Sequence, residues 1–179
     1  LNEIQPDFSA GIVDSLTISD LDKIAVDNFR RRRIEKSGNN SIETVPIEKV
    51  LQDVRLMRQG KMSYACLLLL GKSEKIAECM PQAEIIYEWR NDPKQIHHDD
   101  REVWRAPYFA VYDKIWQKIN TRNMRMPYQE GFIQHEILAF DEKACREAVN
   151  NAVAHRDYSI TGRAIFILAS PNGLTVHSP

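Results

Sequence analysis

The stretch Arg146-Glu147-Ala148-Val149-Asn150-Asn151-Ala152-Val153-Ala154-His155-Arg156-Asp157-Tyr158 is the most informative part of the chain. Its small apolar residues recur at helical spacing and predict an amphipathic helix over 142–156, packed on a core. Glu147, Asn151 and His155 follow one another at four-residue steps, so on a helix they share one face, with neighbours roughly 5–6 Å apart. A carboxylate can polarise a water, and an amide oxygen suits Mg²⁺. The spacing is therefore compatible with a nucleotide-hydrolysing site, and an ordinary solvated helix face is the alternative interpretation.

The pattern Arg-Glu-Ala-x-x-Asn-Ala-x-x-His-Arg-Asp-Tyr, followed by two short strands, resembles a family of bacterial and archaeal transcriptional regulators related to the ATP-dependent DNA helicase RecG. Its members join an AlbA/Schlafen-type DNA-binding domain to a C-terminal ATPase-like domain of the GHKL superfamily (gyrase, heat-shock chaperone, histidine kinase and MutL). The resemblance implies that Glu147 is the water-activating base and that Asn151 is the Mg²⁺ ligand of an ATP site. It also implies that His155, Arg156 and Asp157 belong to the cofactor-binding motif.

The resemblance extends upstream at the level of pattern. Residues 60–72 resemble the middle region of the family, and residues 8–33 resemble the segment that follows the DNA-binding domain. We therefore expect an internal fragment of a longer regulator, which would bind DNA through a domain before residue 1. The adenine-binding Asp of the superfamily would fall where His177 or Ser178 stands, so we expect no meaningful ATPase activity from the fragment alone.

Composition indicates an ordinary globular protein. The 179 residues are 43% hydrophobic and 27% charged, with a net charge of −1, so no overall field attracts nucleic acid or a membrane surface. The longest apolar run, residues 64–70, is too short to cross a bilayer. Three scattered cysteines favour buried thiols over a disulfide framework or a zinc site. The cytoplasm is the expected compartment.

The order of elements predicts an α+β fold. Residues 1–72 form the expected helical cluster, and residues 73–179 form a sheet-and-helix segment in which the ATPase-like domain begins at about 130; a single compact unit is the alternative. The expected helices are 19–36 with Ser19 as N-cap, 46–57, 62–70, 107–119 and 142–156. The expected strands are 83–90, 132–140 and a hairpin of 164–168 with 174–177, whereas 91–101 is expected to be a polar loop.

Two clusters of functional residue types have plainer interpretations. Arg30-Arg31-Arg32-Arg33 could grip phosphate, but four consecutive helical residues point all round the helix, which favours a solvated helix end. His97-His98-Asp99-Asp100 contains metal-ligand types, but neighbours in an extended loop point in opposite directions, which favours a solvated loop.

Two other functions remain open. The segment could be a structural or oligomerisation module, forming a homo-oligomer through an exposed surface of Trp89, Trp104, Tyr112 and Trp116. Direct DNA binding by this segment is a third possibility, which the near-zero charge disfavours.

Overall fold

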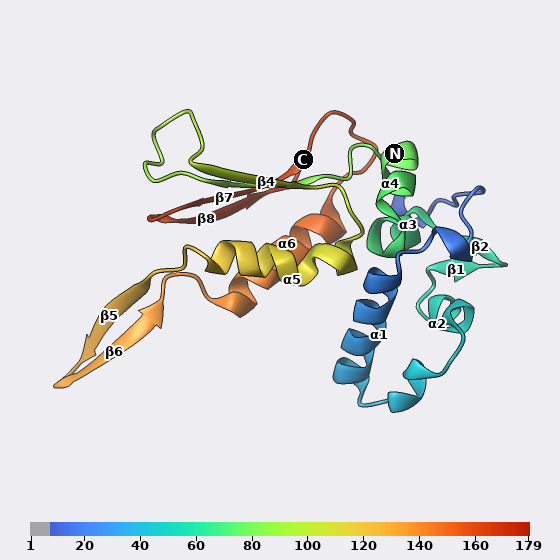
Figure 1. The fold of residues 1–179 in the computed structure, drawn as a ribbon, viewed down its shortest axis with the longest axis horizontal. Coiled ribbons are helices and arrows are strands. Elements are labelled where there is room, and N and C mark those ends of the chain that lie inside the picture. The colour runs from blue at the N-terminus through green and yellow to red at the C-terminus, as the bar shows by residue number, and fades with distance from the viewer. Residues whose placement is uncertain (1–7) are drawn as a thin grey trace, which may run out of the picture. The chain divides into compact units, whose positions relative to one another are not determined.

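Helices and small sheets alternate along the chain in the computed structural model, which describes residues 8–179 (Figure 1). The predicted α+β class is confirmed. The chain divides into two units that are interleaved in sequence. Unit 1 comprises the described residues up to Ala83 together with Arg105–Tyr112 and Asp157–Thr161. Unit 2 comprises Glu84–Trp104, Asp113–Arg156 and Gly162–Pro179.

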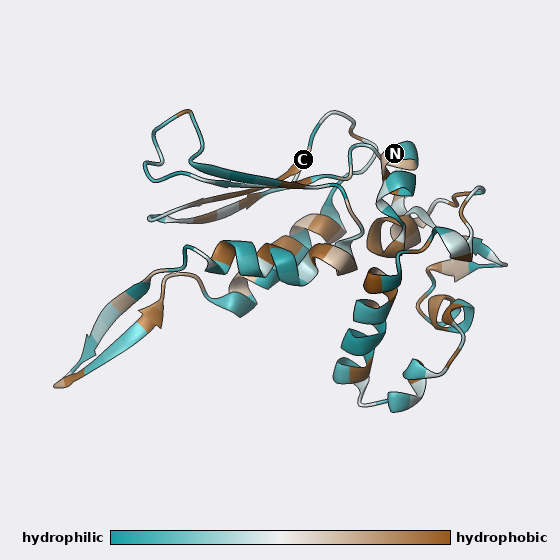
Figure 2. Cartoon of the chain, in the orientation of Figure 1, coloured by the Kyte–Doolittle hydropathy of each residue, from teal (hydrophilic) through white to brown (hydrophobic). Residues whose placement is uncertain are grey.

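Unit 1 is mainly helical. Its helices are α1 (Lys23–Ser37), α2 (Ile47–Asp53), α3 (Tyr64–Leu70) and α4 (Ser73–Cys79), with short 3-10 helices at Phe8–Ala10, Ile18–Asp20 and Asn40–Glu43 and a small hairpin of β1 (Met57–Arg58) and β2 (Lys61–Met62). The apolar side chains of α3 lie in the centre of the core, where Cys66, Leu67 and Leu70 are fully buried. The brown colour of α3 in Figure 2 marks this apolar centre.

The ends of the unit 1 elements correct several sequence predictions. Ser19 does not cap the first long helix; Asp22 does, because its carboxylate accepts the N–H of Ala25 at 2.8 Å. The helix expected over 46–57 ends at Asp53, and α4 was not predicted. Its sequence, Ser73–Cys79, buries only Ile76, so it lacks the repeated apolar spacing that marks a helix.

Unit 2 contains a four-stranded sheet in the order β4-β3-β7-β8. Its strands are β3 (Ile85–Trp89), β4 (Asp100–Trp104), β7 (Ile165–Ser170) and β8 (Gly173–His177); β3 and β7 are parallel and the other pairs are antiparallel. Helix α6 (Glu142–His155) and the unit 2 part of α5 (Tyr108–Asn120) lie along one face of this sheet (Figure 1). The predicted hairpin β7–β8 and the predicted strand β3 are confirmed.

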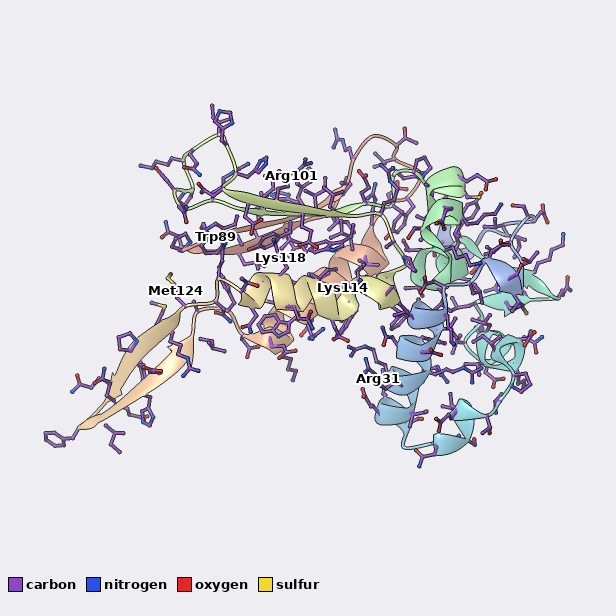
Figure 3. The ribbon with its side chains drawn as sticks, viewed as in Figure 1. Arg31, Trp89, Arg101, Lys114, Lys118 and Met124 are labelled. Carbon is purple, nitrogen blue, oxygen red and sulfur yellow. The ribbon has the colours of Figure 1, made fainter. Side chains whose placement is uncertain are left out.

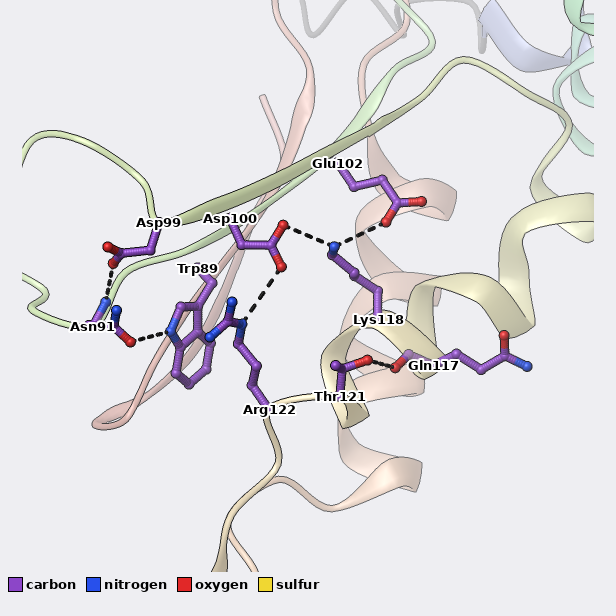
Figure 4. Close-up of polar contacts among 9 residues, drawn as sticks. All are labelled: Trp89, Asn91, Asp99, Asp100, Glu102, Gln117, Lys118, Thr121 and Arg122. Atoms are coloured by element: carbon purple, nitrogen blue, oxygen red, sulfur yellow. Dashed lines mark hydrogen bonds and ion pairs between the residues drawn. The ribbon is translucent and has the colours of Figure 1, made fainter.

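The last two residues of the predicted polar loop, Asp100 and Arg101, are the start of β4, so that prediction was wrong at this end. Asp100, Glu102 and Trp104 share the face of β4 that points to the helices. Lys118 of α5 bonds both acids, at 3.0 Å to Asp100 and 3.4 Å to Glu102 (Figure 4). These ion pairs attach the edge strand to α5 and explain why acidic side chains face inward there.

A second hairpin lies outside this sheet. Among residues 8–179, strands β5 (Arg125–Glu130) and β6 (Ile133–Leu138) pair only with each other, and every residue of both strands is exposed. In Figure 1 the hairpin extends beyond the ends of α5 and α6, which it connects. The strand predicted over 132–140 is therefore present as β6, but it faces solvent.

The thiols and the hydropathy of the helices agree with the sequence. Cys66 and Cys145 are buried free thiols, as predicted, and burial raises the pKa of Cys66 to about 12. Cys79 is half-buried. Within residues 8–179, no helix combines the length and the apolar character that crossing a membrane requires.

Candidate functional site

The candidate site is built on α6, which begins and ends where the sequence predicts. Asp141 caps it by accepting the N–H of Ala144 at 2.8 Å. The stripe of Cys145, Val149, Ala152 and Val153 is buried and packs against the strands β7 and β8. This packing fixes the rotation of the helix about its own axis, and therefore which residues face outward.

Glu147, Asn151 and His155 are all exposed on α6. They occupy successive turns, so the carboxylate, the amide and the imidazole form a row roughly 12 Å long. Their side chains are open to solvent, and a ligand can approach them from outside the helix. The arrangement supplies a hydrogen-bond acceptor, a hard oxygen ligand and a titratable ring in line.

The end of β8 lies next to this row. The Ser178 hydroxyl donates to the carbonyl oxygen of Ala152 at 3.0 Å, which attaches the residue after β8 to the last turns of α6. Ala152 directly follows Asn151 in the chain. The Asn151 side chain itself points about 100° away from Ala152 around the helix.

The other residues of the motif have structural contacts. Arg156 is buried, and its guanidinium donates to the carbonyl oxygen of Arg163. Arg146 bonds Glu142 at 2.7 Å and Asp113 of α5 at 3.1 Å, which holds the two helices together. Asp157 belongs to unit 1, where its carboxylate accepts the N–H of Ser159 at 2.9 Å and organises a turn.

The buried Arg156 therefore does not share the exposed face of Glu147, Asn151 and His155. The sequence motif predicted five site residues, namely Glu147 as the base and four cofactor-binding residues, and the fold exposes Glu147, Asn151 and His155 on one face of α6. Arg156 serves the end of the helix instead. The catalytic role of Glu147 and the cofactor-binding role of the other four remain predictions from the resemblance.

A hollow of about 340 Å³ lies elsewhere in unit 2. Its lining includes Glu88, Arg90, Leu168 and Thr175. By the alternation of side chains along the strands, these residues lie on the face of the sheet opposite α6. Its charges are already paired, because Glu88 accepts from Arg90 at 2.9 Å and lies 3.4 Å from Arg101. We therefore place the candidate site on the exposed row and not in this hollow.

The spacing of the basic run on α1 predicted that its four arginines would not share one face, and the structure agrees. Arg30 donates to the carbonyl oxygens of Ile42 and Glu43. Arg31, labelled in Figure 3, bonds Asn28 at 3.0 Å, whereas the guanidinium of Arg32 lies 3.8 Å from the ring centre of Tyr112. These contacts stay within unit 1 and serve its fold.

The exposed aromatic surface predicted for a partner is wrong for two of its four members. Trp89 and Trp104 are buried, and Trp89 lies between the sheet and α5 in Figure 3. Its indole is fixed by the Arg122 guanidinium over the ring and by a 2.9 Å bond to Asn91 (Figure 4). Tyr112 and Trp116 are half-buried.

The pair of histidines followed by two acids gives no metal site. Asp99 accepts the N–H of Asn91 at 2.7 Å, a bond that lowers the pKa of its carboxyl group. Asp100 is bonded to Lys118. Among the described residues, no group of three or more histidine, cysteine or acidic side chains is arranged to hold a metal ion.

Comparisons with known proteins describe the fold and leave the chemistry open. The model of a domain of unknown function (DUF8451) matches residues 2–86, just under half of the chain. The solved structure of the DIP2311 protein from Corynebacterium diphtheriae is similar, with a TM-score of 0.75 and 21% identity over 97% of this chain and 33% of that one. No curated protein matches. The chain thus spans about a third of the length of the similar structure, and at this identity the likeness shows a common fold.

Proposed function

We propose that unit 2 contributes the first part of a Mg²⁺-dependent ATP-binding site in a longer transcriptional regulator. Glu147 would orient the attacking water, Asn151 would ligate Mg²⁺, and His155 would contact the nucleotide. DNA would be bound by a domain upstream of this segment. The proposal rests on the resemblance of residues 146–158 to the GHKL motif.

The observation that supports it most is the exposure of Glu147, Asn151 and His155 together on α6. A helix packed by its apolar stripe would expose some polar face in any case. The attachment of Ser178 to Ala152 at 3.0 Å holds the residue after β8 against the last turns of α6.

The test is calorimetric ATP titration, with and without Mg²⁺, of a chain extended by about 100 residues beyond Pro179, a typical domain length. We expect saturable Mg²⁺-dependent binding that Asn151→Ala weakens at least tenfold, about 1.4 kcal/mol. Asn150→Ala is the matched control, because the neighbouring amide points about 100° away on the helix. Equal effects of the two variants, or no binding at millimolar ATP, would rule out the site.

Glu147 is tested separately by hydrolysis. We expect Glu147→Ala to lower the turnover of ATP by at least about a hundredfold, the usual contribution of a general base, while binding stays within a few-fold of the wild type. Phosphate release measured under saturating ATP provides the readout. Unchanged turnover in Glu147→Ala would contradict the role of base.

A further inference from the structure

The β5–β6 hairpin is an arm with one apolar face. Directly opposed residues of an antiparallel pair share a face, so Met126 with Ile137, Tyr128 with His135 and Glu130 with Ile133 lie together. Four of these six side chains are large and apolar, and all four are at least half exposed. The other face carries Arg125, Pro127, Gln129, Gln134, Glu136 and Leu138, with an ion pair of 3.1 Å between Arg125 and Glu136.

Such an arm is unusual in isolation. A two-stranded sheet is at best marginally stable in water, and three or more strands are needed for stability of their own. Here an apolar face is presented to solvent by both strands, and the tip of the hairpin is brown in Figure 2. Phe132 in the turn is fully exposed. These features indicate an arm that adds further strands from a partner.

The two outer edges of the arm differ. The turn consists of two residues, Gly131 with a positive φ of 62° and Phe132. In a hairpin with a two-residue turn, the flanking pair, here Glu130 and Ile133, is hydrogen-bonded. Hydrogen-bonded and non-hydrogen-bonded pairs alternate from this turn to the base of the hairpin. The N–H of Ala139 donates to the carbonyl oxygen of Met124 at 2.9 Å, as the alternation requires for this pair. Pro127 is therefore in a pair whose backbone groups point outward, and its missing N–H interrupts the outer edge of β5.

The outer edge of β6 has no such interruption. By the same alternation, the backbone N–H and C=O groups of Gln134, Glu136 and Leu138 point away from β5. No proline lies in β6. The arm thus offers one competent edge for strand addition.

We propose that this edge pairs with β6 of a second copy of the chain about a two-fold axis through His135, joining two arms into a four-stranded antiparallel sheet. In this register Ile133 lies opposite Ile137 of the second copy, and Gln134 lies opposite its Glu136. Phe132 at the turn falls opposite Leu138 of the second copy. Apolar residues thus meet apolar ones, and the carboxylate meets an amide that can donate to it.

Neighbouring registers are less complementary. An axis through Glu136 puts the two Glu136 carboxylates opposite each other, which destabilises the pair. An axis through Gln134 puts Ile133 opposite His135 and Glu136 opposite Phe132 of the second copy. A two-fold interface must be complementary to itself. Of these three registers, the one centred on His135 pairs apolar residues with apolar ones and Gln134 with Glu136, and His135 then lies opposite its own copy.

The first test compares two substitutions at matched positions. Met126 and Ile137 are cross-strand neighbours on the apolar face, exposed to 52% and 51%. We expect sedimentation of the 179-residue chain to show a dimer whose Kd rises about tenfold or more in Ile137→Asp and changes much less in Met126→Asp. A monomer up to the high micromolar range would overturn the proposal. Equal weakening by both variants would also overturn it, because it would indicate face-to-face stacking of the arms.

The second test fixes the register by cross-linking. At the axis, His135 faces its own copy as a non-hydrogen-bonded pair, the closer kind, which brings the two Cβ atoms near disulfide distance. In a Cys79→Ser background, we expect His135→Cys to form a covalent dimer under mild oxidation, and Gln134→Cys and Gln129→Cys to stay largely uncoupled. Circular dichroism checks that each variant is folded. Equal cross-linking at all three positions, or none at 135, would contradict the register.

Discussion

At the scale of single residues, Tyr87 shows how burial sets chemistry. Its side chain is fully buried in β3, and its hydroxyl has no hydrogen-bond partner among residues 8–179. Burial is the main cause that raises the pKa of Tyr87 to about 12, from an ordinary value of 10.0. Between these pH values the folded chain keeps the phenolic proton and the unfolded chain loses it. The ionisation of this group therefore leaves the stability of the folded chain unaffected below pH 10 and lowers it as the pH rises toward 12.

We accordingly expect the free energy of unfolding of the wild type to fall over this pH range by about 2 kcal/mol more than that of Tyr87→Phe. At neutral pH, Tyr87→Phe should be neutral or stabilising by up to about 1 kcal/mol, since it removes an unsatisfied buried hydroxyl. Urea denaturation at several pH values measures both effects. Tyr128→Phe, at an exposed tyrosine, serves as the control, and parallel pH curves for wild type and Tyr87→Phe would contradict the argument.

At the scale of elements, the hairpin arm depends on one amide at its base. The Asn123 side chain donates to the carbonyl oxygen of Phe140 and accepts its N–H, both at 2.8 Å. Met124, labelled in Figure 3, begins the arm directly after it. Asn123→Ala leaves two backbone groups beside the buried Phe140 ring without their partner, so we expect a loss of about 1–3 kcal/mol. Hydrogen exchange should become faster across 124–139 and stay unchanged in unit 1.

Gln129→Ala provides the comparison at the other end of the arm. Gln129 donates to the carbonyl oxygen of Gly131 at 3.1 Å, on an exposed turn. Its loss should alter exchange only near the tip, because exposed hydrogen bonds compete with water. If hydrogen exchange across 124–139 stayed slow in Asn123→Ala, the prediction would be wrong, and the pairing of the two strands alone would stabilise the arm.

At the scale of the whole molecule, the chain passes between the two units more than once, so each unit is built from separate segments of the sequence. Residues 157–161 follow α6 of unit 2, yet they belong to unit 1, where Tyr158 is buried in the core. Its carbonyl oxygen accepts from the Gln82 side chain at 2.6 Å. We expect Tyr158→Ala to lower the free energy of unfolding by about 3 kcal/mol, as other aromatic truncations in cores do. Faster hydrogen exchange in α3, far away in sequence, would report the loss.

Tyr128→Ala is the control for side-chain size, because Tyr128 is half exposed. It should change the free energy of unfolding by no more than about 0.5 kcal/mol. If Tyr158→Ala left α3 protected, the core of unit 1 would not depend on the returning segment.

Local sequence was sufficient for the elements whose signals lie within one or two turns. The four-residue spacing of Glu147, Asn151 and His155, with the apolar stripe between them, predicted both α6 and its exposed face. The turn at Pro171-Asn172-Gly173 predicted the β7–β8 hairpin. These features depend on backbone periodicity and turn conformation, which are properties of neighbouring residues.

Tertiary structure decided the features that depend on partners distant in sequence. Strand β4 was missed because its inward face carries Asp100 and Glu102, which look like loop residues until Lys118 pairs with them. Trp89 appeared available to a partner, but the guanidinium of Arg122, two residues after the end of α5, lies over its ring. Burial of a charge or an indole depends on which groups arrive from elsewhere in the chain. The helical period of α6 and the spacing of its polar row were thus determined by the sequence alone, whereas the inward acids and the buried tryptophans depend on long-range packing.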